Sequence, residues 1–397
     1  MFVTGVGAWT PFGLGFEHLW QALIEARPAF APVGSGFGPD PQLLAGRITD
    51  LKPFRAAFPK ARPPLPIPVT RVVLAAAREA CLDAALESEA RAAAGVILNR
   101  NRGPAQVVAK IIKPVFAKGV RKTSPLLFSQ SVANAPLGAV ATQLGLRGPQ
   151  LQTMGGGALL AAHDALRCGE ADALVVGGFE ELVSELFEAD IANGVIDARR
   201  ELEDWQRGPL MSEGCACVVL ETRAHLEARG ATPRAQLLGV ERGLSLRAVG
   251  EDPQLDPLSR WGHPSGEGFA SMAERSLAAA DISPSQVDYH ASNGALVPAF
   301  TAAEEHLRAQ LGIRALMGRG RCGSLDRLLG EAMGMGAIAK LAWVATMLAE
   351  GELTRATTLG PDAGQPGTTA LPQPANILLT HLDAHASQLS ALVRSPV

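Results

Sequence analysis

Apolar, strand-like runs alternate with amphipathic segments along the whole chain. The strand-like runs stand at residues 2–7, 95–98, 173–176, 211–221, 235–240, 287–289, 376–380 and 389–394. Segments with apolar residues at helical spacing stand at 16–25, 69–86, 134–144, 158–167, 268–280, 301–311 and 331–349. Short buried strands between helices are typical of sheets covered on both faces, so the pattern predicts an α/β protein. The alternation occurs twice, which predicts two halves, 1–225 and 226–397.

Two stretches interrupt this alternation. Residues 31–67 are rich in proline and glycine without a clear period, which predicts a surface excursion outside the core. Residues 100–123 carry a basic cluster, formed by Arg100, Arg102, Lys110, Lys113, Lys118, Arg121 and Lys122. The cluster is either a solvated loop or a docking patch for an acidic partner.

The stretch 152–178 has the shape of an active site without a reactive atom. Gly155, Gly156 and Gly157 open the helix expected at 158–167. A helix N-terminus stabilises a thiolate or an oxyanion, so a catalytic chain would carry its nucleophile here. The three glycines either cradle a phosphate, although their spacing is not G-x-G-x-x-G, or let the backbone approach a ligand tunnel closely.

Composition excludes several classes of protein. Of the 397 residues, 47% are hydrophobic and 19% are charged, which supports a large core. The net charge of −3 and the single tyrosine argue against a nucleic-acid interface or an anionic membrane surface. The sequence shows neither a signal pattern nor an apolar run of membrane-spanning length, which predicts a soluble, cytoplasmic protein.

The five cysteines are scattered and odd in number, which argues against a disulfide framework. Cys215 and Cys217 lie two apart in a strand, so both face one side. They are interpreted as small buried hydrophobic residues, because no second Cys/His pair has the spacing of metal ligands. No metal and no cofactor are expected.

Six segments, taken in order, resemble the β-ketoacyl synthase family of the thiolase fold. They are VTGVGAWTPFG with LWQAL, SPLLFSQSVANAPLGAVATQLGLRGPQLQT, GEADALVVGGFEE, MSEGCACVVLE, VDYHASNGALVPAFTAAEE and LLGEAMGMGAIAKL. The resemblance implies a duplicated, five-layered α-β-α-β-α fold that forms dimers, with the strand at 173–176 pairing across the dimer axis. In the family, a cysteine takes an acyl chain from an acyl carrier protein, and two histidines promote decarboxylation of the malonyl unit.

By this resemblance, the catalytic positions of the family are degenerate in this chain. Gly155 stands at the nucleophile position, Asn293 at the first histidine and Arg327 at the second. Cys322 aligns with the family's lysine, and the glycine-rich oxyanion loop aligns with 382–388, where no glycine remains. A neutral amide and a permanently charged guanidinium do not shuttle protons.

The roles of several side chains near these positions have more than one interpretation. His290 and His385 are either packed, hydrogen-bonded histidines or substitute bases. Arg327 is either an ion-paired plug in the old cavity or a ligand for a carboxylate or phosphate. Gly156 and Gly157, together with the two histidines, are the candidates for lining a substrate tunnel.

The arginine at the second histidine position resembles the chain-length factors of type II polyketide systems. The main hypothesis is therefore a non-catalytic subunit that forms a heterodimer with an active ketosynthase and is served by an acyl carrier protein. It would act in polyketide, polyene or fatty-acid-like biosynthesis. The alternatives are an acyltransferase-type enzyme using non-standard residues, and a homodimeric acyl-ligand-binding scaffold.

Overall fold

The computed structural model describes residues 1–58, 67–196, 209–246, 264–293, 297–360, 363–383 and 387–396. Its main sheet has 11 strands in the order β11-β10-β14-β15-β9-β1-β8-β7-β5-β6, with β2 paired to β1. The strands are β1 (Phe2–Thr10), β2 (Gly13–Leu14), β5 (Gly95–Asn99), β6 (Gln150–Thr153), β7 (Ala173–Glu180), β8 (Gly214–Glu221), β9 (Ala235–Leu244), β10 (Tyr289–Ala291), β11 (Cys322–Gly323), β14 (Asn376–Leu382) and β15 (Ser387–Arg394).

Helices follow the predicted amphipathic segments and add several shorter elements. They are α1 (Phe16–Ile24), α2 (Lys52–Ala57), α3 (Pro68–Asp83), α4 (Ser88–Ala93), α5 (Ala105–Lys118), α6 (Pro125–Phe128), α7 (Ala135–Leu144), α8 (Gly157–Arg167), α9 (Ser184–Ala192), α10 (Arg223–Ala228), α11 (Gly266–Ala279), α12 (Pro298–Gln310), α13 (Ala315–Gly318), α14 (Asp326–Leu329) and α15 (Gly336–Glu350). None of the helices in the described ranges is long and apolar enough to cross a membrane.

The main sheet consists of two copies of one strand arrangement, joined edge to edge. The order β6-β5-β7-β8-β1 in the first half is repeated as β11-β10-β14-β15-β9 in the second. The directions also repeat, because β5 is parallel to β6 and β7, just as β10 is parallel to β11 and β14. The two copies meet where β1 pairs with β9 over Phe2–Gln236 and Val3–Ala235. The duplicated fold is therefore visible in the topology itself.

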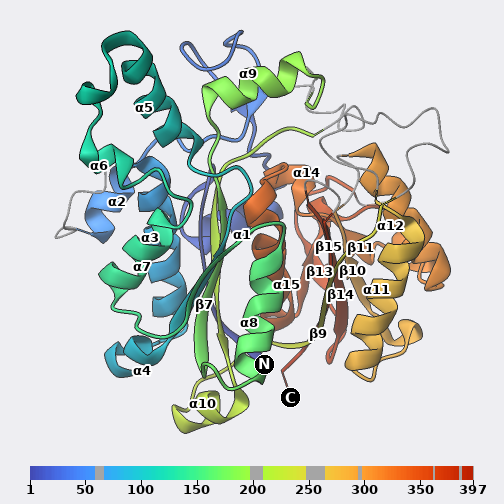
Figure 1. Cartoon of the computed structure of the whole chain (residues 1–397). Helices are drawn as coiled ribbons and strands as arrows, with labels where there is room; N and C mark the ends of the chain where they lie inside the picture. The colour runs from blue at the N-terminus through green and yellow to red at the C-terminus, as the bar shows by residue number, and fades with distance from the viewer. Residues whose placement is uncertain are drawn as a thin grey trace.

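Helices cover both halves and also fill the space between them (Figure 1). Helix α3 packs on β1, β7 and β8, whereas α11 packs on β9 and β15 with α12 beside it. Between the halves, α8 and α15 contact strands of both. Helix α15 is buried on all sides from Gly336 to Leu348, as expected of a helix that is apolar all round. This confirms the five-layered α-β-α-β-α arrangement.

The strand expected to pair across a dimer axis lies inside the sheet. All eight residues of β7 are buried, and β7 is hydrogen-bonded to β5 on one side and to β8 on the other. The prediction for residues 173–176 is therefore wrong. The edge strand of the first half is β6, which follows β5 in the sheet and leads into α8. The apolar run at 173–176 is itself typical of a strand in the middle of a parallel sheet. The expected pairing across a dimer axis came only from the resemblance.

The predictions for the two interrupting stretches also need correction. Within 31–58, Val33, Phe37 and Leu43 are buried in one apolar cluster with residues of both halves, so this stretch is not a surface excursion. Single apolar residues between turns leave no period to recognise. Residues 59–66 lie outside the described ranges.

Residues 100–123 do not form a solvated loop, because α5 occupies most of them. Arg100 and Arg102 point inward, where Arg100 pairs with Glu181 and Arg102 pairs with Asp190. These two arginines therefore neutralise buried acids. The docking alternative remains a prediction, and it concerns the exposed Lys110, Lys113 and Arg121 in particular.

Candidate active site

Gly155, the residue predicted at the nucleophile position, lies directly before Gly156, the residue that caps α8. Gly155 and Gly156 have φ values of 60° and 70°, a left-handed conformation that favours glycine. The Gly155 carbonyl oxygen accepts hydrogen bonds from Arg242 Nε and Ser387 Oγ, both at 2.8 Å. A Cβ atom at Gly155 would lie 3.0 Å from Arg242 Nη2 and 3.2 Å from Ser387 Oγ. A side chain here would therefore require the Arg242 side chain to move.

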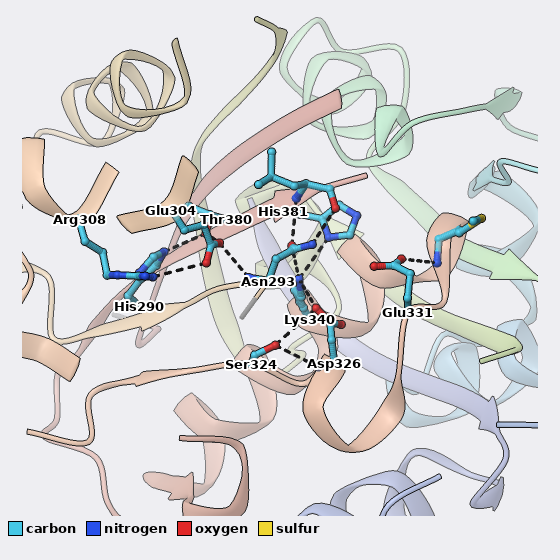
Figure 2. A network of polar contacts seen from close by, with 12 residues as sticks. His290, Asn293, Glu304, Arg308, Ser324, Asp326, Glu331, Lys340, Thr380 and His381 are labelled. Carbon is cyan, nitrogen blue, oxygen red and sulfur yellow. Dashed lines mark hydrogen bonds and ion pairs between the residues drawn. The ribbon is translucent and has the colours of Figure 1, made fainter. Parts of the chain in front are cut away.

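Asn293 is locked in a polar network of second-half residues, which Figure 2 shows. Its Nδ2 donates to the Leu382 carbonyl at 2.7 Å, and the Leu382 N–H donates back to Oδ1 at 3.0 Å. Lys340 Nζ donates to the same Oδ1, and the Asn293 backbone N–H donates to Glu304 at 2.8 Å. The amide thus holds the end of β14 in place, and it has no proton to exchange near neutral pH.

Lys340, on α15, is a central residue of this network that the sequence analysis missed. Its side chain is fully buried and forms an ion pair with Asp326 at 3.0 Å. It also lies 3.3 Å from His381 Nδ1. Lys340 is the single charged residue between positions 337 and 348, and that isolation was the available signal. A lone lysine in a buried apolar helix requires a partner.

Arg327 is partly buried and donates from Nη1 to the Thr358 carbonyl at 2.6 Å, and burial lowers its pKa. The preceding residue, Asp326, is buried and forms an ion pair with Lys340. Both interpretations of Arg327, as an ion-paired plug and as a ligand for a carboxylate or phosphate, therefore remain predictions.

His290 is a packed, hydrogen-bonded histidine. Its Nε2 lies 2.8 Å from Thr380 Oγ1, which donates to Glu304 at 2.9 Å, so His290 Nε2 carries the proton. Its Nδ1 lies 3.7 Å from the Cys322 sulfur. Burial lowers the pKa of His290 to about 4, whereas burial raises the pKa of Cys322 to about 12. A neutral imidazole beside a neutral thiol is consistent with a structural pair.

The two glycines among the tunnel candidates have different neighbours. Gly157 faces Thr153, whose Cβ would lie 3.3 Å from a Cβ at Gly157. Gly156 lies next to His381, and a Cβ at Gly156 would be 3.9 Å from its Cδ2. His385 falls outside the described residues. The tunnel-lining roles therefore remain predictions, and of the two glycines Gly156 is the one that lies next to His381.

Several groups of the described network are held by hydrogen bonds or an ion pair within it. Its lysine is ion-paired, its asparagine is bonded to the main chain, and its histidines are neutral. Burial, with a smaller contribution from Lys340, holds the pKa of His381 well below its usual value. In the part of the chain that the structure describes, no group of three or more His, Cys, Asp or Glu side chains is arranged to hold a metal ion.

Three buried carboxyl groups, of which Glu331 lies beside the network, are protonated more readily than usual. Burial raises the pKa of Glu180 and of Glu213 to about 7. Burial, followed by repulsion from Asp326 and Asp383, raises the pKa of Glu331 to about 8. The folded chain therefore binds protons that the unfolded chain releases between pH 4.5 and about 8.

We expect the free energy of unfolding to fall as the pH rises through this window, because each of these folded-state pKa values is raised. Glu331→Gln removes one titration while keeping a similar shape, so the variant should lose less stability than wild type between pH 6 and pH 9. The difference should be on the order of a few kcal/mol. Urea denaturation at both pH values measures it, with exposed Glu170→Gln as the control. Equal pH dependence of wild type and Glu331→Gln would contradict the assignment.

Comparison with known proteins identifies the family to which this chain belongs. Residues 1–225 match the family described as "Beta-ketoacyl synthase, N-terminal domain". The 3-oxoacyl-[acyl-carrier-protein] synthase 2 of Coxiella burnetii is 27% identical over 328 residues, covering 75% of this chain and 73% of that protein. Nodulation protein E of a Rhizobium species is 27% identical over 311 residues, covering 74% and 72%.

Solved structures agree with this match. The ishigamide ketosynthase/chain length factor has a TM-score of 0.80 at 18% identity, covering 100% of this chain and 99% of that one. A type II PKS acyl-carrier protein in complex with its ketosynthase has a TM-score of 0.79 at 17% identity, with the same coverage. The fold is thus the thiolase-like fold of ketosynthases. The chain belongs to the β-ketoacyl synthase family, as the six ordered segments predicted.

Proposed function

We propose that this chain is a non-catalytic, chain-length-factor-like subunit. It pairs with an active β-ketoacyl-[acyl-carrier-protein] synthase and shapes the tunnel for the growing acyl chain. The observation that carries the proposal is Asn293, held by Lys340 and the Leu382 main chain at the position where the family has a proton-transferring histidine. With glycine at position 155 there is also no nucleophile to take the acyl group.

We propose that the partner contact runs along β6. This edge strand of the first half carries Leu151, which is 45% exposed, and Met154 follows it at 64%. Exposed edge strands with apolar side chains invite pairing with a second chain. One solved relative is a ketosynthase/chain length factor, which supports a ketosynthase as the kind of partner.

A second apolar surface lies on α5. Val108, Ile112 and Phe116 stand four residues apart, so they form one stripe along the helix. Phe116 is 87% exposed, which is unusual for a phenylalanine in the absence of a partner. The stripe is consistent with a protein contact near the basic side chains of α5. An acyl carrier protein that serves the pair would deliver a polyketide, polyene or fatty-acid-like chain.

Co-expression with the ketosynthase encoded nearest to this chain tests the proposal. We expect native mass spectrometry to show a one-to-one heterodimer. Leu151→Asp should weaken that heterodimer at least about tenfold, because it places a charge at a desolvated strand edge. Leu82→Asp is the matched control, since Leu82 is also exposed, at 56%, but lies on α3. A stable monomer would contradict the proposal, and a homodimer would favour the scaffold alternative.

A further inference from the structure

The imidazole of His381 lies between the N-termini of the two central helices. On one side, a Cβ atom added to Gly336, the first residue of α15, would lie 2.6 Å from His381 Cε1. On the other side, a Cβ added to Gly156, the residue that caps α8, would lie 3.9 Å from His381 Cδ2. Nε2 stands between these two ring carbons. The ring thus fits closely against Gly336, whereas space of about one atom remains toward Gly156.

The protonation state of this ring follows from its neighbours. Lys340 Nζ, which can only donate, lies 3.3 Å from His381 Nδ1 (Figure 2). Nδ1 is therefore the acceptor, and the proton of the neutral ring is on Nε2. His381 is 1% exposed, and its Nε2 has no hydrogen-bond partner among the described residues. A buried donor without an acceptor typically costs about 1–3 kcal/mol, so such a group points to a missing ligand.

The surroundings of Nε2 favour a polarised oxygen. Helices α8 and α15 have 11 and 15 residues, and both direct the positive end of their dipole toward this ring. Lys340 polarises the imidazole through Nδ1, which strengthens Nε2–H as a donor. Because Asp326 balances the charge of Lys340, the site offers a strong donor without a free positive charge. This combination suits a carbonyl oxygen better than a highly charged anion.

We infer that His381 Nε2–H, below the N-terminus of α8, binds the acyl carbonyl oxygen of a thioester. The nature of the ligand rests on the proposed function, whereas the donor and the space beside Gly156 rest on the geometry alone. The chain would then hold the carbonyl of an acyl group without attacking it. His381 acts as a binding residue, and Lys340 positions it by fixing its tautomer.

The test is NMR of the chain labelled with ¹⁵N in its eight histidine rings, alone and paired with its ketosynthase. The probes are octanoyl-pantetheine, its S-octyl thioether analogue without a carbonyl, and octanoate. His381→Gln assigns the His381 signal, and His290→Gln assigns the other described buried histidine if the first variant does not fold. We expect a protected Nε2–H signal that octanoyl-pantetheine moves downfield and the thioether does not.

Affinity provides the second measurement. His381→Leu should bind octanoyl-pantetheine about tenfold more weakly, the value of one good hydrogen bond, while His381→Gln should recover part of that loss. A shift with octanoate alone would support the donor site with a carboxylate as the source of the oxygen. A signal that no probe moves would overturn the inference and leave a buried water as the partner of Nε2. Heterodimer formation is scored separately, so this result and a failure of the proposed pairing are distinguishable.

Discussion

Lys340→Met is expected to destabilise the protein by about 3–5 kcal/mol, because it leaves the Asp326 carboxylate buried without its cation. That is a large fraction of the roughly 5–15 kcal/mol by which a typical protein is stable. Methionine fills nearly the same space, so the lost charge, and not a cavity, dominates the effect. Denaturant unfolding at pH 7 measures it.

Two further variants separate this explanation from simple damage to the core. Adding Asp326→Asn to Lys340→Met should recover much of the stability, because the double variant buries no charge. Exposed Lys110→Met on α5 should change stability by no more than about 0.5 kcal/mol. A Lys340→Met effect below 1 kcal/mol, or no recovery in the double variant, would show that the ion pair does not hold this part of the fold.

Gly155→Cys should make no carbon–carbon bond with malonyl-carrier protein. Its left-handed backbone imposes a strain of roughly 1–2 kcal/mol, and the Arg242 side chain must move aside. The new thiol would find no proton acceptor in the described network, since Asn293 is an amide and His381 Nδ1 is already bonded to Lys340. Losing a complete base and nucleophile unit typically reduces rates by about 10⁴-fold or more.

This experiment needs a background in which Cys168 is serine, because Cys168 is exposed and would react with iodoacetamide in any variant. In that background, the parent chain should remain unmodified by acyl-carrier protein in intact mass spectra. Gly155→Cys should gain one alkylation at most. Condensation by the single variant, without a ketosynthase partner, would mean that Asn293 and Arg327 do not stand at the catalytic positions.

Much of the fold was predictable because its helices and strands have periodic patterns of apolar residues. The strands at 95–98 and 235–240 and the helices at 69–86 and 158–167 all form close to the predicted limits. Edge and interior strands were confused, since β6 has only four residues and lacks the apolar run of β7. Pairing partners depend on contacts distant in sequence, which a local pattern does not contain.

The site residues were predicted from the resemblance, whereas the contacts among them were not. Alignment placed glycine, asparagine and arginine at three functional positions, but it treated each position separately. In the structure Asp326 is buried and pairs with Lys340, whereas its neighbour Arg327 donates to the Thr358 carbonyl, since one step along the short helix α14 rotates a side chain by about a quarter turn or more. Lys340 and His381 lie 41 residues apart in sequence, so their contact leaves no local signature.

The burial of α15 has a consequence for how the chain is made. This helix covers the inner faces of β1, β7 and β8, yet Gly336 follows Glu221, the end of β8, by about 115 residues. At roughly 5–20 residues per second, the ribosome would extend the chain for about 6–23 seconds before that cover emerges. During this interval the nascent first half presents an apolar sheet face to the solvent and to chaperones. The two halves are thus duplicates in topology but not independent in synthesis, because the first is completed by a helix from the second.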